Sequence, residues 1–232
     1  MVVPLTDAQW VRTEPLLPDR TPRRGGRWRD HRQVIDAIAW KFRTGSPWVH
    51  LPAGYGSWKG VHTRLRNRAI DGTRARVFTA LLARADAEGD LDRVVSVDST
   101  IVRAPQSAAG AAPEGAPADE PDHHALGRSR GGLTTKIHLA TDGRCRPLCF
   151  HLTPGQAGDA PAFEHIMAAL RVPRPVGRPP AFDREAYKQR NTVERCTNRL
   201  KTRRGLATRY EKTATVFQAG LHIAGILICS AR

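Results

Sequence analysis

Apolar residues in the first ninety positions recur at helical spacing and predict a layer of short helices. Thr6 or Asp7 can cap a first helix, and a second helical run stops at Gly45. A third helix is expected over 57–70, and a fourth begins at Thr73. Short helices joined by tight turns favour a helix-turn-helix arrangement, and a plain helical bundle is the alternative.

From residue 92 onward the pattern changes to β-branched and alternating residues, which predict strands. The segment 94–97 is mostly apolar and predicts a buried strand that ends at Asp98-Ser99-Thr100. Residues 133–152 predict a hairpin that turns at 141–143. A helix follows over 160–170, so this part of the chain begins in the order strand, hairpin, helix.

The last third of the chain predicts two helices of different character. The helix over 183–204 has two faces, because its polar and apolar residues separate on a helical wheel. One face carries the polar residues Tyr187, Arg190, Glu194 and Lys201. The opposite face carries the apolar residues Val193, Cys196 and Leu200. The run 216–228 is apolar and predicts a core helix, whereas the Pro- and Arg-rich segment 171–180 cannot form a central strand.

Charge is distributed unevenly along the chain. The 232 residues include 37 Lys and Arg but 22 Asp and Glu, which gives a net charge of +15. The net charge is +7 over 1–90, −2 over 91–170 and +10 over 171–232. Two basic segments around a slightly acidic one are expected where the flanks bind a polyanion and the middle carries catalytic carboxylates, so we predict DNA as the partner. Codon bias is the alternative reason for the many arginines.

Several other classes of protein are excluded by the sequence. The longest apolar stretch, 219–228, is far short of the roughly 20 residues that span a bilayer. No apolar leader opens the chain, so we expect no membrane contact and a cytoplasmic location. The four cysteines form no C-x-x-C pair, which argues against a disulfide scaffold and a structural zinc site. We interpret Cys149 and His151 as core residues and 122–124 as loop polarity.

Two carboxylates are the candidates for chemistry. Asp98 follows a strand, where α/β proteins place ligands, and Glu194 lies on the polar face of its helix. Together they could hold Mg²⁺ or Mn²⁺, and a pair of such ions promotes phosphodiester cleavage. Arg190 and Lys201 would then hold DNA phosphates. The alternative for Glu194 is a solvated ion pair among arginines.

These segments resemble the DDE transposases of bacterial insertion sequences. The most similar group is the fifth insertion-sequence family, which belongs to the broader fourth-family superfamily. The resemblance is carried by Val97-Asp98-Ser99-Thr100, by 127–138, by Tyr187-x-x-Arg190-x-x-x-Glu194-x6-Lys201, and by Leu51-Pro52 and Ser57-Trp58-Lys59. It implies an α+β chain with two domains. A helical, helix-turn-helix-like DNA-binding domain would occupy 1–89, and a ribonuclease-H-like α/β catalytic domain would occupy 92–232.

The resemblance also implies an activity and its residues. A transposase binds the double-stranded ends of its element, cuts them in a Mg²⁺-dependent reaction and joins them to target DNA, as a homo-oligomer on DNA in the bacterial nucleoid. The implied catalytic residues are Asp98, Tyr187, Arg190, Glu194 and Lys201, with Asp98 and Glu194 as the metal ligands. The expected DNA-binding residues are Lys59, Arg64, Arg66, Arg128, Arg130, Arg190 and Lys201.

One feature of the family is missing from the sequence. Its second catalytic Asp follows a later strand, and the stretch between Leu170 and Asp183 is too short for strand, helix and strand. We therefore expect an internal deletion near 173–180, an incomplete catalytic domain and impaired cleavage. Asp159 is interpreted as a carboxylate at a helix start rather than as the missing ligand. The alternative function is a non-catalytic, DNA-binding transposase remnant that acts as a regulator or inhibitor.

Overall fold

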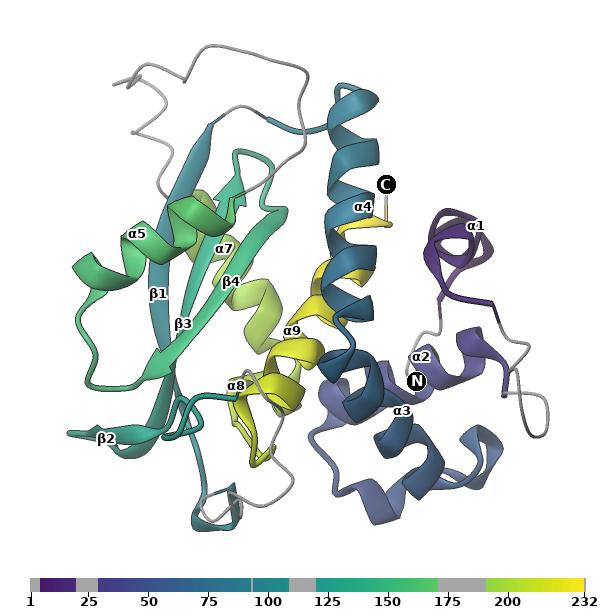
Figure 1. The fold of residues 1–232 in the computed structure, drawn as a ribbon, viewed down its shortest axis with the longest axis horizontal. Coiled ribbons are helices and arrows are strands. Elements are labelled where there is room, and N and C mark those ends of the chain that lie inside the picture. Colours follow the sequence, from purple (N-terminus) through teal and green to yellow (C-terminus); the bar gives the residue numbers. More distant parts are fainter. Residues whose placement is uncertain (1–4, 20–28, 93, 109–119, 171–190, 232) are drawn as a thin grey trace.

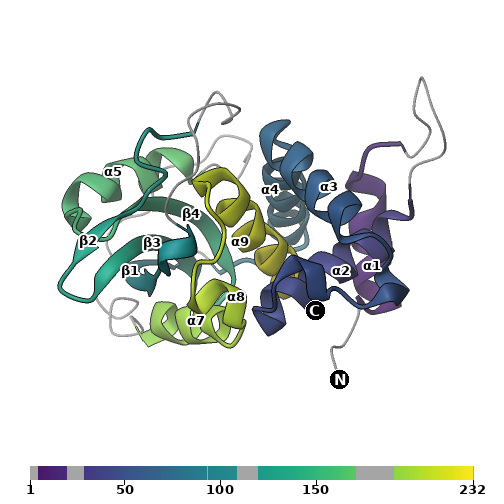
Figure 2. The ribbon, with the colours of Figure 1, turned by 90° about the horizontal axis from the view of Figure 1, so that it is seen from below.

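The computed structural model describes residues 5–19, 29–92, 94–108, 120–170 and 191–231 (Figure 1). The helices are α1 (Asp7–Thr13), α2 (His31–Thr44), α3 (Trp58–Ile70), α4 (Thr73–Ala87), α5 (Asp159–Ala169), α7 (Asn191–Lys201), α8 (Arg204–Ala207) and α9 (Ala214–Cys229). The strands are β1 (Val95–Arg103), β2 (Gly127–Ser129), β3 (Gly132–Asp142) and β4 (Pro147–Pro154). Helices α1–α4 form a layer beside the sheet, and α9 contacts both α2–α4 and β4 (Figures 1 and 2).

The ends of the N-terminal helices follow from local sequence. The Thr6 hydroxyl accepts a hydrogen bond from the Gln9 amide while the Gln9 side chain accepts one from the Thr6 amide, so the predicted start of α1 is confirmed. Helix α2 ends where Gly45 takes the left-handed conformation, at φ 68°. Helix α4 starts at Thr73 as predicted.

The sheet is antiparallel, and β3 is its central strand. Strand β1 pairs with one edge of β3, while β4 and the short β2 pair with the other edge. No described strand pairs with the outer edge of β1. The predicted end of β1 at Asp98-Ser99-Thr100 is wrong, because pairing with β3 continues as far as Arg103 and leaves Asp98 in mid-strand.

Helices cover both faces of the sheet, with α5 on one face and α7 on the other (Figure 2). The prediction that Val94–Val97 form a buried strand is also wrong, since Val102 is the one buried residue of β1 and this strand lies at a sheet edge. On α5, Ile166 is buried, but Phe163 and Met167 are 51% and 47% exposed. No described element therefore buries Phe163 and Met167 on the outer side of α5.

The C-terminal helices form much of the core. Nearly every residue of α9 is buried, which confirms the predicted core helix at 216–228. Val193, Cys196 and Leu200 of α7 are buried as predicted, and Glu194 is exposed. The helix ends at Lys201 rather than at Arg204, because the next turn closes through a hydrogen bond from the Arg203 amide to the Leu200 carbonyl and Arg203 is extended. Among the described helices, none combines the length and hydropathy needed to cross a bilayer.

Candidate functional site

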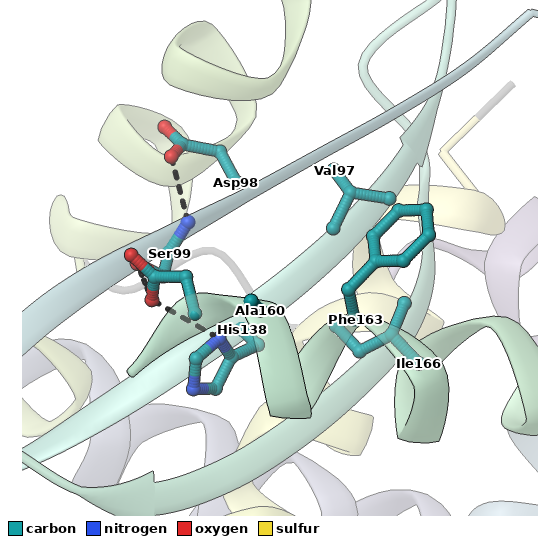
Figure 3. A pocket seen from close by; sticks show the side chains of 8 residues that line it. Val97, Asp98, Ser99, His138, Ala160, Phe163 and Ile166 are labelled. Atoms are coloured by element: carbon teal, nitrogen blue, oxygen red, sulfur yellow. Dashed lines mark hydrogen bonds and ion pairs between the residues drawn. The ribbon is translucent and has the colours of Figure 1, made fainter. Parts of the chain in front are cut away.

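Asp98 is exposed near the middle of β1, on the side of the sheet that faces away from α5. Its Oδ1 accepts a hydrogen bond of 2.8 Å from the Ser99 amide. The Ser99 hydroxyl donates to Oδ1 of Asp159, at the start of α5, also at 2.8 Å. Successive side chains of a strand point to opposite faces, so Asp98 is directed toward the α7 side of the sheet (Figure 3).

Helix α7 runs along β1 in the same direction. The Lys201 ammonium donates to the Ile101 carbonyl at 3.4 Å, and Thr208 pairs in parallel with Arg103 farther along the strand. Glu194 precedes Lys201 by two helical turns, about 10 Å of helix, and lies on the same face. Asp98 precedes Ile101 by three strand residues, also about 10 Å. Glu194 is therefore expected at the level of Asp98.

The two carboxylates offer few ligands for a divalent ion. Asp98 and Glu194 are both exposed, and the described residues include no group of three His, Cys, Asp or Glu that could hold a metal. Two neighbouring cations need several carboxylates and ligand distances of 2.0–2.6 Å. The described residues do not fit a two-ion site. The predicted site residues Tyr187 and Arg190 lie outside the described part of the chain.

Asp159 belongs to a separate polar cluster between β1, β3 and α5. Its Oδ1 also accepts from the Lys136 ammonium at 3.1 Å and lies 3.6 Å from Nδ1 of His138. Partial burial raises the pKa of Asp159, but hydrogen bonds from Ser99 and Lys136 outweigh it and leave the pKa below its ordinary value. Its position at the start of α5 agrees with the interpretation as a helix-start carboxylate.

A cavity of about 340 Å³ lies beside this cluster (Figure 3). Its lining residues are Val97, Asp98, Ser99, His138, Asp159, Ala160, Phe163 and Ile166, and the side chain of Asp98 points away from the others. Sequence reasoning missed Ser99, Lys136 and His138. The alternation of β1 and β3 could have found them, because it places all three on the strand face opposite to Asp98.

Cations gather around Ile101, three residues along the strand from Asp98. Arg103 and Arg130 line a shallow pocket of about 420 Å³ together with Ile101. The Lys201 ammonium reaches the Ile101 carbonyl from the opposite side of the strand. Arg128 and Arg130 are both exposed, at β2 and in the turn that follows it. We call Arg103, Arg130 and Lys201 the Ile101 basic cluster.

The cations of α3 point in different directions. Lys59 is exposed, and Arg66 is partly exposed. Arg64 is half-buried like Arg66; its Nη1 contacts Nδ1 of His31 at 3.3 Å, and burial together with Arg68 lowers its pKa. Of these predicted DNA-binding residues, Lys59 is therefore the most accessible.

Two family models match successive parts of the chain. Residues 5–78 match the family described as "Putative transposase of IS4/5 family", and residues 89–179 match the "Transposase DDE domain". Together they cover the helical layer, the sheet and α5.

Three curated relatives each align with less than half of the chain. An uncharacterized protein of Sinorhizobium fredii, y4sN, is 35% identical over 107 residues, which are 46% of this chain and 82% of the relative. The "Insertion element IS402 uncharacterized 16.2 kDa protein" of Burkholderia cepacia is 35% identical over 112 residues, 45% of this chain and 76% of the relative. The "Putative transposase for insertion sequence element IS6501" of Brucella ovis is 28% identical over 127 residues, 41% of this chain and 98% of the relative. No solved structure matches the chain.

Proposed function

Because this chain belongs to the DDE-type transposases of bacterial insertion sequences, we propose that it binds the ends of its element and that its own strand cleavage is impaired. Transposases of this family act on DNA. The observation that carries the binding half of the proposal is the Ile101 basic cluster, which lies along β1 beside Asp98. The proposal that cleavage is impaired depends on the carboxylates Asp98 and Glu194.

Two exposed surfaces supply cations for DNA phosphates. The first is formed by the exposed Arg103, Arg128 and Arg130, and the half-buried Lys201 lies on the other side of β1. The second is α3, on which Lys59 and Arg66 are accessible at least in part. Guanidinium and ammonium groups that neutralise phosphates provide most of the affinity for DNA and make that affinity depend on salt. In this proposal Lys201 holds a phosphate near the scissile bond, and α3 contacts the element end.

Impaired cleavage is supported by an incomplete acidic site. Asp98 and Glu194 share one side of the sheet, whereas Asp159 faces the other side and is bonded to Ser99 and Lys136. Two carboxylates do not balance two divalent ions, so no cleavage step is assigned to them. Two further acidic residues that precede Glu194 in sequence, Asp183 and Glu185, lie outside the described residues.

The comparison with the Brucella ovis relative supports the loss of a block. Its 127 aligned residues correspond to only 41% of the 232 residues here, so part of the relative has no counterpart in this chain. The outer edge of β1 has no described partner strand, as expected if an adjoining strand has been lost. We propose that β1, β3, β4 and α5 are the surviving first half of a ribonuclease-H-like domain.

A regulatory role is the second candidate function. A chain that keeps its cationic surfaces but lacks a complete acidic site would occupy element ends without cutting them. It would then compete with an intact transposase for the same ends. Among the described residues, the combination of the Ile101 basic cluster with two candidate carboxylates, Asp98 and Glu194, favours this role over a catalytic one.

The test of binding uses the purified full chain and two duplexes of equal length, one with the element end and one with the same bases scrambled. We expect tighter binding to the element end and a steep loss of affinity with salt, by a log–log slope of about −0.9 per phosphate contact. Arg130→Gln should weaken binding, whereas Arg144→Gln, at the opposite end of the hairpin, should change it little. Equal affinity for both duplexes with a flat salt dependence would contradict the proposal.

A further inference from the structure

A buried arginine without a partner lies in the helical layer, away from the acidic site. Arg74 is in the first turn of α4 and is only 3% exposed. Its Nε is buried and has no hydrogen-bond partner among the described residues. Burying a charged group without a partner costs several kcal/mol, so such a group indicates a missing anion.

The neighbours of Arg74 add positive charge. Burial, together with the nearby guanidinium groups of Arg68 and Arg64, lowers the pKa of Arg74 to about 10, and Asp71 acts in the opposite direction. Asp71 is a carboxylate near these three arginines. Its Oδ2 accepts a hydrogen bond from Arg68 at 2.9 Å, and its Oδ1 accepts one from the Thr73 amide at 2.9 Å. Asp71 is thus already engaged by other groups.

His31 supplies no compensating charge. Its Nε2 lies 2.9 Å from the Pro18 carbonyl, which can only accept, so Nε2 donates. Its Nδ1 lies 3.3 Å from Nη1 of Arg64, which can only donate, so Nδ1 accepts. Both contacts together require a neutral imidazole, in agreement with the pKa of His31, which burial lowers.

The geometry points to a phosphate-binding site formed by Arg64, Arg68 and Arg74 where α3 meets the start of α4. The guanidinium fork matches a phosphate through paired hydrogen bonds, and the start of the 15-residue α4 adds a favourable helix dipole. We propose a backbone phosphate of DNA as the ligand, because Lys59 and Arg66 of the same helix α3 reach the surface. This assignment rests on the proposed function, since it assumes that the chain binds DNA.

The first test measures DNA binding of the full chain as a function of salt. Arg74→Met is expected to weaken binding to duplex DNA about threefold to tenfold at low salt and to reduce the salt slope by about 0.9, the contribution of one phosphate. Arg74→Lys keeps the charge but loses the guanidinium fork, so its affinity for duplex DNA should lie between those of the wild type and Arg74→Met. Arg84→Met is the matched control, because Arg84 is exposed near the other end of α4 and donates to the Arg12 carbonyl.

The second test uses inorganic phosphate as the probe and the thermal unfolding midpoint as the readout. Phosphate should raise the midpoint of the wild type above that in chloride of equal ionic strength and pH, and Arg74→Met should abolish this rise. Without phosphate, Arg74→Met should be at least as stable as the wild type, because it removes a buried charge. A purely structural arginine would instead lower the midpoint when replaced.

The outcomes separate this inference from the proposed function. If the wild type binds duplex DNA and Arg74→Met binds it with the same affinity and salt slope, the phosphate site is wrong and the proposed function stands. If the wild type does not bind duplex DNA, the proposed function is wrong. A phosphate effect that still depends on Arg74 would then assign the site to free phosphate and overturn the assignment to DNA.

Discussion

Lys41 and Glu211 form an ion pair inside the protein, at 3.4 Å, with side chains only 3% and 8% exposed. The Trp48 indole donates to the same carboxylate at 3.3 Å. The Lys41 ammonium also lies over the rings of Trp48 and Tyr210, each 5.5 Å from the ring centroid. This group joins α2 to the segment that leads into α9, so single residues couple distant parts of the chain.

Removing one partner of this pair should destabilise the protein strongly. Lys41→Met leaves the Glu211 carboxylate buried and without its cation, which typically costs about 3–5 kcal/mol. Urea unfolding followed by circular dichroism measures the loss, with Lys59→Met, at an exposed position of α3, as the control. Glu211→Leu combined with Lys41→Met should recover much of the stability. A loss below about 1 kcal/mol in the single variant would show that the pair contributes little.

His222 gives the stability of the protein a dependence on pH. Burial beside Phe78 and Phe150 lowers its pKa from 6.5 to about 4. Above pH 6.5 His222 is neutral in both the folded and the unfolded chain, so burying it carries no protonation penalty and stability is highest there. As the pH falls from 6.5 toward 4, the unfolded chain gains a proton that the folded chain does not, so stability decreases. At about 1.4 kcal/mol per pKa unit, this loss is at most about 3–4 kcal/mol.

The variant His222→Phe should lose this part of the pH dependence. We expect the difference in unfolding free energy between pH 7 and pH 4.5 to be smaller in the variant than in the wild type. Parallel urea titrations at the two pH values measure it, and the other histidines remain in both proteins as an internal reference. Identical pH dependence in the two proteins would mean that His222 is not held neutral by the fold.

At the scale of elements, local signals were sufficient where a single segment decides its own structure. The Thr6 cap, the Gly45 stop and the apolar run of α9 each depend on neighbours in sequence, and all three predictions are confirmed. The end of β1 depends on pairing with β3, and the exposure of Phe163 depends on what covers α5. Those properties are set by tertiary contacts that a single segment does not encode.

The candidate site shows the same division between local and tertiary signals. The wheel of α7 correctly placed Glu194 on the exposed face because helical periodicity determines it. The Ser99, Lys136 and His138 cluster around Asp159 was not predicted, because it joins two strands and a helix start. The contact between Arg64 and His31 likewise joins two helices, α3 and α2.

The glycines of α9 allow close contact with the helical layer. A Cβ built on Gly220 would overlap the ring of Phe42 in α2. Gly220→Ala should therefore destabilise the protein by about 1–3 kcal/mol through overpacking. Gly60→Ala is the matched control, because nothing lies within 4 Å of its Cβ position in exposed α3, and it should stabilise by about 0.5–1 kcal/mol. Chemical denaturation measures both, and equal effects would contradict the packing described for α9.

At the scale of the whole molecule, the helical layer and the sheet share one core. Helix α9 contacts α2, α3 and α4 as well as β4, and one continuous cluster of buried residues runs through all of them. The division into a helical domain over 1–89 and a catalytic domain over 92–232 stays a prediction. Because the described helices and strands share this core, the proposed loss of cleavage is compatible with a folded chain that binds DNA.

Strand cleavage is the measurement that tests the central claim most directly. Purified chain is incubated with DNA that carries the element ends, in Mg²⁺ and separately in Mn²⁺, and products are separated on a denaturing gel. We predict binding to the ends without new strand breaks, because Asp98 and Glu194 are too few carboxylates for two ions. Cleavage by the wild type that disappears in both Asp98→Ala and Glu194→Ala, each still able to bind the DNA, would contradict the account.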